Sequence, residues 1–224
     1  MAFSSLSLSL FSSIFAAVAF FLSWSSAFNC SYVNFSSIQD TDLNIGFGLW
    51  SHNWYAISLP LDNSFIFQTC ITYRSTPIDA PMKAARVFAI IALLLGGVFF
   101  FASLFSVSCF GGRSDEKLTL TRSEGVAYLL VCLCQGLSLL LLNSTICTNN
   151  SLIADLQSTL NDREKIHIDF IENCSISKGA RCCIAAIVFW FMAALTSCLA
   201  VSAERKKEVN KEYLREPLVP SDIL

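Results

Sequence analysis

The sequence predicts an all-α membrane protein, in which four transmembrane helices form a bundle and a small antiparallel β-sheet lies outside the membrane. Hydrophobic residues make up 54% of the 224 residues and charged residues only 14%, whereas a soluble domain carries about 25% charged residues. The mean hydropathy is +0.57. A helix needs about 20 mainly apolar residues to cross a bilayer. Four stretches reach that length without Asp, Glu, Lys, Arg or His: Leu6–Phe28, Val87–Phe110, Val126–Ile146 and Cys182–Val201.

The first apolar stretch has two interpretations. A run of this length that ends in the small residues Ser25-Ser26-Ala27 is compatible with a signal peptide cleaved before Phe28. A signal peptide usually has basic residues ahead of its apolar run, and this chain has none there. We therefore expect an uncleaved span, and the topology of the other three spans is the same in either case.

The basic residues predict the orientation of the four spans. The loop at 111–124 and the segment after Val201 are both rich in Lys and Arg, which is typical of cytoplasmic segments. Both termini are then cytoplasmic, and the loops at 29–86 and 147–181 are extracellular or lumenal. This arrangement belongs to the plasma membrane or another membrane of the secretory pathway. In or beside these two loops the chain has five acceptor sequences for N-glycosylation, at Asn29, Asn34, Asn143, Asn149 and Asn173.

Alternating apolar residues in the first long loop predict about four strands. Leu43–Trp50 alternates with period two, as a half-buried strand does. Trp54–Leu59 and Phe65–Tyr73 flank a turn-forming segment at 61–64 and so predict a hairpin, and Tyr32–Phe35 is a further candidate. In the second loop we expect a short helix around 152–160 and one more strand at Ile166–Phe170. The four spans and this sheet form one unit at 1–204.

Three motifs lie between the first strands and the second span. They are Phe47-Gly48-Leu49-Trp50, Cys70-Ile71-Thr72-Tyr73 and Lys83-Ala84-Ala85-Arg86-Val87. Together they resemble the claudin signature, in which Gly-Leu-Trp precedes a cysteine pair and Ala-Ala-Arg opens span 2. The matching motif residues are Gly48, Leu49, Trp50, Cys70 and Arg86. The four-span plan is also similar to that of the wider superfamily, which includes peripheral myelin protein and auxiliary subunits of glutamate receptors and calcium channels.

The resemblance implies a function in protein–protein contact. A claudin-like chain acts in cell adhesion, in membrane organisation or in a paracellular-type barrier, and its partners are copies of itself or another polytopic membrane protein. The alternative that the resemblance offers is an auxiliary subunit that modulates an ion channel or receptor.

Four of the ten cysteines fall in the two long loops: Cys30, Cys70, Cys147 and Cys174. Four cysteines in an oxidising compartment allow three pairings. The claudin partner of Cys70 would follow Trp50, but Ser51-His52-Asn53-Trp54 occupies that place. We expect Cys30–Cys70, because Cys30 opens the strand that should run beside the others, and therefore Cys147–Cys174. Pairings that link the two loops are the alternative.

Four residues of the spans have expected roles in packing. We expect Arg86 to anchor the start of span 2 at the membrane interface, with its stem along apolar surface, and the alternative is a specific bond to the first-loop sheet. Ala92 and Gly96 are small residues that let a neighbouring helix of the bundle approach closely, and the alternative is a contact face for a partner. Gln135, near the middle of span 3, is expected to bond across helices.

The sequence favours a protein that is not an enzyme. The four apolar stretches contain no ionisable residue, which proton relays and ion-coupled transporters normally need, and we find no pattern for a cofactor, a metal ion or nucleic acid. Arg205-Lys206-Lys207 directly follows a span and is expected to attract anionic lipid. The polar segment at 205–224 predicts a disordered cytoplasmic tail, whose last residues, Ser221-Asp222-Ile223-Leu224, could bind a cytoplasmic scaffold.

Overall fold

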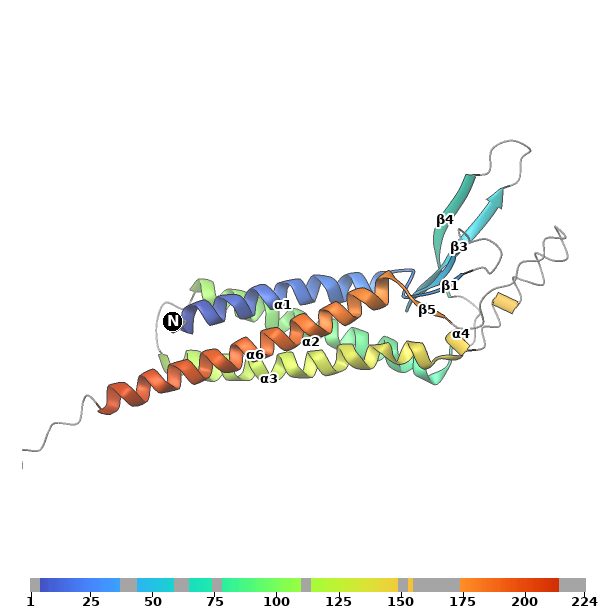
Figure 1. Ribbon diagram of the computed structural model, residues 1–224. Helices are drawn as coiled ribbons and strands as arrows, with labels where there is room; N and C mark the ends of the chain where they lie inside the picture. Colours follow the sequence, from blue (N-terminus) through green and yellow to red (C-terminus); the bar gives the residue numbers. More distant parts are fainter. Residues whose placement is uncertain are drawn as a thin grey trace, which may run out of the picture.

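Four long helices form a bundle with a β-sheet at one end (Figure 1). The computed structural model describes residues 5–36, 44–58, 65–73, 78–109, 114–148, 153–154 and 174–213. The start of α1 and the end of α6 lie at the end of the bundle opposite the sheet (Figure 1), as an even number of spans requires. The long helices are α1 Ser5–Phe28, α2 Ala80–Cys109, α3 Ser114–Leu137 and α6 Lys178–Tyr213.

Each of these helices is long and apolar enough to cross a membrane, so the expected four-helix plan is confirmed. The candidate spans are Ser7–Phe28, Ala80–Phe105, Ser123–Asn143 and Lys178–Lys207. The third span runs from α3 into a 3-10 helix, η1 (Ser138–Asn143), and a single turn, α4 (Thr145–Thr148), follows it. The helices extend beyond the apolar stretches that define them in the sequence, because good helix formers continue the backbone hydrogen bonding past the apolar run.

This extension corrects one prediction. The spans were expected to contain no ionisable residue, but the candidate span in α3 includes Glu124, which is 6% exposed. Its Oε1 is buried without a hydrogen-bond partner. Arg86 likewise lies inside the candidate span of α2. The sequence analysis placed Glu124 in the loop at 111–124, because an acidic residue ends an apolar stretch. The helix α3 nevertheless includes Glu124.

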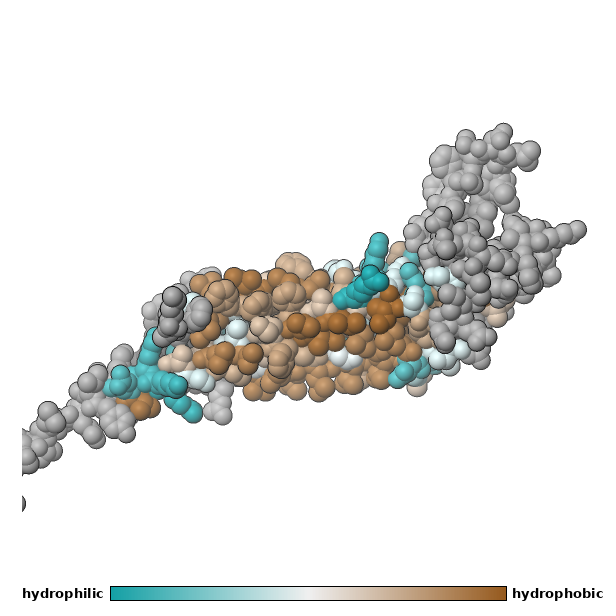
Figure 2. Space-filling model, viewed as in Figure 1, coloured by the Kyte–Doolittle hydropathy of each residue, from teal (hydrophilic) through white to brown (hydrophobic). Residues whose placement is uncertain are grey.

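Small side chains make up most of the interior of the bundle, with a few large rings such as Trp190 and Tyr128 among them, and large apolar side chains cover its outer surface. The fully or almost fully buried positions include Ala16, Ala19, Ala92, Ala186, Ala193 and Ala194. Large apolar side chains on the same helices face outward, among them Phe21, Leu94, Phe105, Leu133 and Val188. Figure 2 shows the resulting apolar surface over the length of the helices. This is the reverse of a soluble protein and matches helix packing in membranes, where small residues allow close approach.

The sheet has five antiparallel strands in the order β4-β3-β2-β1-β5. Four come from the first loop, as expected: β1 Val33–Ser36, β2 Asn44–Phe47, β3 Ser51–Ser58 and β4 Phe65–Thr72. The second loop adds β5, Ser175–Ile176, beside β1. The strand expected at Ile166–Phe170 and most of the helix expected at 152–160 lie outside the described residues.

The inner face of the sheet packs on the end of the bundle. Val33 and Phe35 of β1 and Ile45 and Phe47 of β2 are buried in one cluster with Met82, Ala85 and Ala89 of α2. The ring of Phe35 meets that of Phe47 edge to face, with 5.7 Å between centroids. Because alternate strand residues point to one face, the period-two pattern that predicted these strands also provides the side chains that join sheet and helices.

The segment after the fourth apolar stretch is helical over more residues than the sequence suggested. The segment at 205–224 was expected to be disordered, but α6 continues as a helix to Tyr213. The segment Glu204–Tyr213 is rich in Glu and Lys, which favour helix, and it extends a helix that is already nucleated. Residues 214–224, with the expected scaffold-binding end, lie outside the described residues.

Candidate functional site at the sheet–bundle junction

Arg86 connects the start of α2 to the sheet. Its Nε donates a hydrogen bond to the Leu49 carbonyl oxygen over 2.6 Å. Its guanidinium carbon lies 5.1 Å from the ring centroid of Trp50 and 5.4 Å from that of Tyr73, which is within the range of a cation–π interaction. Arg86 therefore makes the specific bond to the first-loop sheet that the sequence analysis held as the alternative, and the expectation of a simple interfacial anchor is wrong.

Tyr73 completes this contact from the end of β4. Its hydroxyl donates to the Gly48 carbonyl oxygen over 3.0 Å. Burial raises the pKa of Tyr73, while the nearby positive charge of Arg86 acts to lower it, and burial dominates. The phenol is therefore protonated at neutral pH and remains a hydrogen-bond donor. The turn after β2 receives one bond from Tyr73 and one from Arg86, at adjacent carbonyls.

Gly48 is required by the close approach of three backbone segments. A Cβ atom at this position would collide with the Asn29 carbonyl oxygen and lie 2.9 Å from that of Ser51. The Gly48 N–H donates to the same Ser51 oxygen over 2.7 Å, which closes the turn into β3. Leu49, the next residue, is buried in the core between sheet and helices. In the Gly-Leu-Trp motif, Gly48 therefore forms the tight turn, Leu49 packs in the core, and the ring of Trp50 contacts the Arg86 cation.

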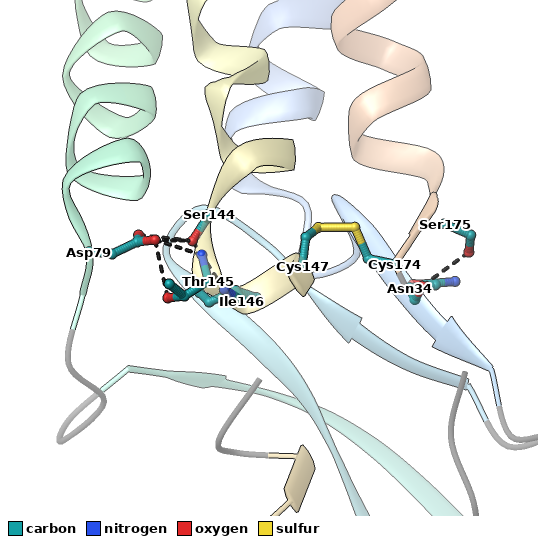
Figure 3. Close-up of a disulfide and its surroundings, with 8 residues drawn as sticks. All are labelled: Asn34, Asp79, Ser144, Thr145, Ile146, Cys147, Cys174 and Ser175. Carbon is teal, nitrogen blue, oxygen red and sulfur yellow. Dashed lines mark hydrogen bonds between the residues drawn. A yellow bond between two sulfur atoms is a disulfide. The ribbon is translucent and has the colours of Figure 1, made fainter. Parts of the chain in front are cut away.

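Two disulfides hold the loops, with the expected pairing. Cys30–Cys70 joins the segment after α1 to β4, and Cys147–Cys174 joins α4 to the segment before β5. Figure 3 shows the second bond between its two segments. Beside the first, Asn53 of β3 pairs with Cys70 and donates from Nδ2 to the Ser31 hydroxyl over 2.6 Å. The first disulfide therefore links the segment before β1 to β4, and the second links the segment before β5 to the helical turn α4.

His52 lies within the aromatic part of the junction. Its ring stacks on Phe47, with 6.0 Å between centroids, and tilts against Tyr73 at 5.2 Å. Burial lowers the pKa of His52, because the charged form loses hydration there. The neutral ring is thus the form that packs between the two strands.

Asp79 forms a second connection, which sequence analysis missed. Its carboxylate accepts bonds from the Met82 N–H (3.2 Å), the Ser144 hydroxyl (2.8 Å) and the Thr145 N–H (2.7 Å). These bonds cap the start of α2 and clamp it to the start of α4 (Figure 3). Burial acts to raise the pKa of Asp79, but the bonds from Thr145, Ser144 and Met82 outweigh it and the pKa is lowered. An acidic residue one position before a helix is a capping signal, so the sequence could have predicted that Asp79 caps α2. It could not have predicted the bonds from Ser144 and Thr145.

The candidate glycosylation residues have different surroundings. The Asn29 side-chain oxygen accepts the Ser31 N–H over 2.8 Å. Asn34 lies inside β1, between β2 and β5, and its Oδ1 is buried without a partner. Asn143 is exposed at the end of η1. Asn149 and Asn173 lie outside the described residues.

The three packing residues named from the sequence lie in the bundle core. Ala92 is fully buried. Gly96 faces the indole of Trp190, since a Cβ there would lie 2.7 Å from the ring, and Trp190 Nε1 donates to the Ser23 hydroxyl over 3.0 Å. Gln135 Nε2 donates to the Cys183 sulfur over 3.2 Å, which is a bond from α3 to α6. These polar contacts join three different helices within the candidate spans.

The geometry of the junction is that of a rigid connection. The side chains of Arg86, Tyr73 and Asp79 are bound to backbone or to other side chains of the protein, and within the described part of the chain no three His, Cys, Asp or Glu residues lie together as a metal site. Beyond the junction, β4 forms one edge of the sheet, and Thr69, Cys70, Ile71 and Thr72 on it are exposed.

Comparison of the sequence with protein-family models and with curated proteins finds no match. The resemblance to claudins therefore rests on the motif residues and the four-span plan.

Proposed function

We propose that this chain is a multi-pass membrane protein that acts by protein–protein contact, as a claudin-like adhesion or membrane-organising protein. The observation that carries the proposal is the fixed sheet at one end of the four-helix bundle. Two disulfides and the contacts of Arg86 and Asp79 hold the sheet there. A rigid sheet with an exposed edge is suited to binding another protein, because little conformational freedom is lost on association.

Insertion into a membrane is supported by the distribution of side chains on the bundle. Large apolar side chains point outward on every long helix, which is costly in water and favourable in lipid. The short segment that leads from α2 into α3 carries Arg113, Lys117 and Arg122, and the end of α6 carries Arg205, Lys206, Lys207 and Lys211. Basic residues in short segments next to spans are typical of the cytoplasmic side, which favours a cytoplasmic location for both termini. The sheet then lies on the extracellular or lumenal side, where its disulfides are stable.

The partner that the sheet suits best is a second copy of the same chain. β4 has β3 as its neighbour on one side within the described sheet, and an edge strand is a template for pairing with another strand. Its sequence, FIFQTCIT, has no charged residue and no proline. Two copies of β4 can therefore meet antiparallel about a two-fold axis without charge repulsion.

Cell clustering tests this function. Expression of the intact chain in non-adherent cells is expected to cluster them, and Ile71→Lys on β4 is expected to abolish clustering because a charge on an edge strand blocks strand addition. Ile176→Lys on β5 is the matched control, since it places the same charge on an equally exposed isoleucine at the other edge of the sheet. Clustering that is absent with the intact chain, or that survives Ile71→Lys, would contradict the proposal.

The alternative is an auxiliary subunit of a channel or receptor. It predicts that a much larger polytopic protein co-purifies with this chain in mild detergent, and that Ile71→Lys leaves this association unchanged because the contact lies along the helices. Self-association alone in the same preparation favours adhesion.

A further inference from the structure

The outward face of α6 changes from apolar to basic at the end opposite the sheet. Ile184, Val188, Phe191, Leu195 and Leu199 are exposed along it at spacings of three and four, so they form one stripe on the helix. The same spacing continues through Ser202, Arg205 and Lys206 to Val209 and Asn210. The lipid-facing stripe therefore runs directly into two cations.

Two of the three acidic residues at the end of α6 fall on positions that continue its bundle-facing side. Ala193, Ser197 and Ala200 are buried against the rest of the bundle, and the same helical spacing leads from Ala200 to positions 204 and 208, both Glu. No acidic residue lies three or four positions from Lys206, whereas Glu208 lies three positions after Arg205. Both basic side chains are exposed.

A shallow hollow lies over this basic face. Its volume is about 630 Å³, and the described residues that line it are Ser202, Arg205, Lys206, Val209 and Asn210. Two cations, a hydroxyl and an amide suit an anionic group with several acceptor oxygens. Arg205 lies six residues beyond Leu199, which is about 9 Å along a helix. The headgroup layer outside the hydrocarbon is about 5–8 Å thick, so the long side chain of Arg205 can reach back into that layer.

We propose that Ser202, Arg205, Lys206 and Asn210 form a binding site for the headgroup of an anionic phospholipid in the leaflet next to the cytoplasm, with its acyl chains along Leu195 and Leu199. The inference rests on the proposed membrane insertion of the chain but not on its adhesive function. The sequence analysis expected all three residues of Arg205-Lys206-Lys207 to attract anionic lipid. The proposed site uses only Arg205 and Lys206, because Lys207 lies on another face of the helix.

Retention of lipid by the purified protein tests the site. The full chain is purified in mild detergent with an equimolar mixture of phosphatidylinositol 4,5-bisphosphate and phosphatidylcholine, and bound lipid is counted by native mass spectrometry. We expect the anionic lipid to be retained preferentially and the double variant Arg205→Gln/Lys206→Gln to bind it about thirtyfold more weakly, since each basic residue contributes about 1 kcal/mol near an anionic surface.

The matched control is Lys207→Gln/Lys211→Gln, which removes the same charge from positions on other faces of the helix and is expected to retain the lipid. Equal losses in both variants would show a general charge effect and overturn the site, as would no loss in the first variant.

Inorganic phosphate is expected not to displace the lipid, and full displacement would overturn the assignment to a lipid. Carbonate extraction of the expressing cells tests membrane insertion separately, and clustering of the Arg205→Gln/Lys206→Gln variant tests adhesion separately.

Discussion

Arg86, Tyr73 and Asp79 each use a polar group to join elements that are distant in the sequence. Arg86 and Tyr73 bind adjacent carbonyls of the turn after β2, and Asp79 accepts bonds from the Ser144 hydroxyl and the Thr145 N–H at the start of α4. Because each group is partly withdrawn from water, loss of one partner leaves the other with an unmet hydrogen bond, which costs more than the bond itself contributed.

Arg86→Lys is expected to lower the free energy of unfolding by about 1.5–3 kcal/mol, the range for hydrogen bonds of charged groups. Lysine keeps the charge but lacks the planar guanidinium that contacts Trp50 and Tyr73 while its Nε binds Leu49. Lys83→Arg is the control, since Lys83 is exposed three residues earlier on the same helix, and it should change stability by less than about 0.5 kcal/mol. Thermal unfolding in detergent measures both, and equal stability of Arg86→Lys and the unsubstituted chain would contradict the role given to Arg86.

Asp79 predicts a loss of stability in acid. Its pKa is lowered from the ordinary value of 3.8, so the charged form is favoured in the folded state. Its contribution is fully present above pH 3.8 and is lost as the pH falls through the lower folded value. Asn also caps helices, so Asp79→Asn isolates the charge. The difference in melting temperature between the two proteins should shrink as the pH falls from 6 to 3, and a constant difference over that range would argue against the clamp.

At the scale of elements, close approach between helices decides the packing. α1 and α6 contact one another through serine pairs as well as alanines, for example Ser12 and Ser197, whose hydroxyl oxygens lie 2.7 Å apart. A second pair, Ser13 and Ser103, joins α1 to α2 at 2.8 Å. Gly96 allows Trp190 of α6 to lie against α2, so the largest buried side chain of the bundle depends on the smallest residue opposite it.

Gly96→Ala should destabilise the bundle by about 1–3 kcal/mol, the usual cost of overpacking a filled core, because the added methyl would lie 2.7 Å from the Trp190 ring. Gly136→Ala in α3 is the matched control. No atom lies within 4 Å of the Cβ that it adds, so the better helix propensity of alanine should leave stability equal or higher by up to about 1 kcal/mol. Thermal unfolding of the two variants gives the comparison, and equal effects would show that Gly96 has room for a methyl group.

For the whole molecule, the sequence predicted the elements better than the contacts between them. Hydropathy gave the four helices, and period-two alternation gave the first-loop strands, because both patterns reflect which faces are buried. The contact between Arg86 and the sheet could not be predicted from the sequence. A cation at the start of a span can lie in water or bind a neighbouring element, and the sequence does not show which element lies beside it. The predicted ends of the helices at Glu124 and after Val201 were wrong. Charged residues end an apolar stretch in the sequence, but they do not end an α-helix.

Cross-linking between copies tests most directly whether the β4 edge makes the proposed contact. Thr69→Cys, near the middle of β4 and so near the two-fold axis, and Ile176→Cys on β5 place a thiol on an exposed strand at each edge of the sheet. Mild oxidation of intact cells, with the unsubstituted chain as background, is followed by electrophoresis without reductant. We expect a reducible dimer from Thr69→Cys and none above background from Ile176→Cys. No dimer from Thr69→Cys, or equal dimer from both variants, would contradict the contact through β4.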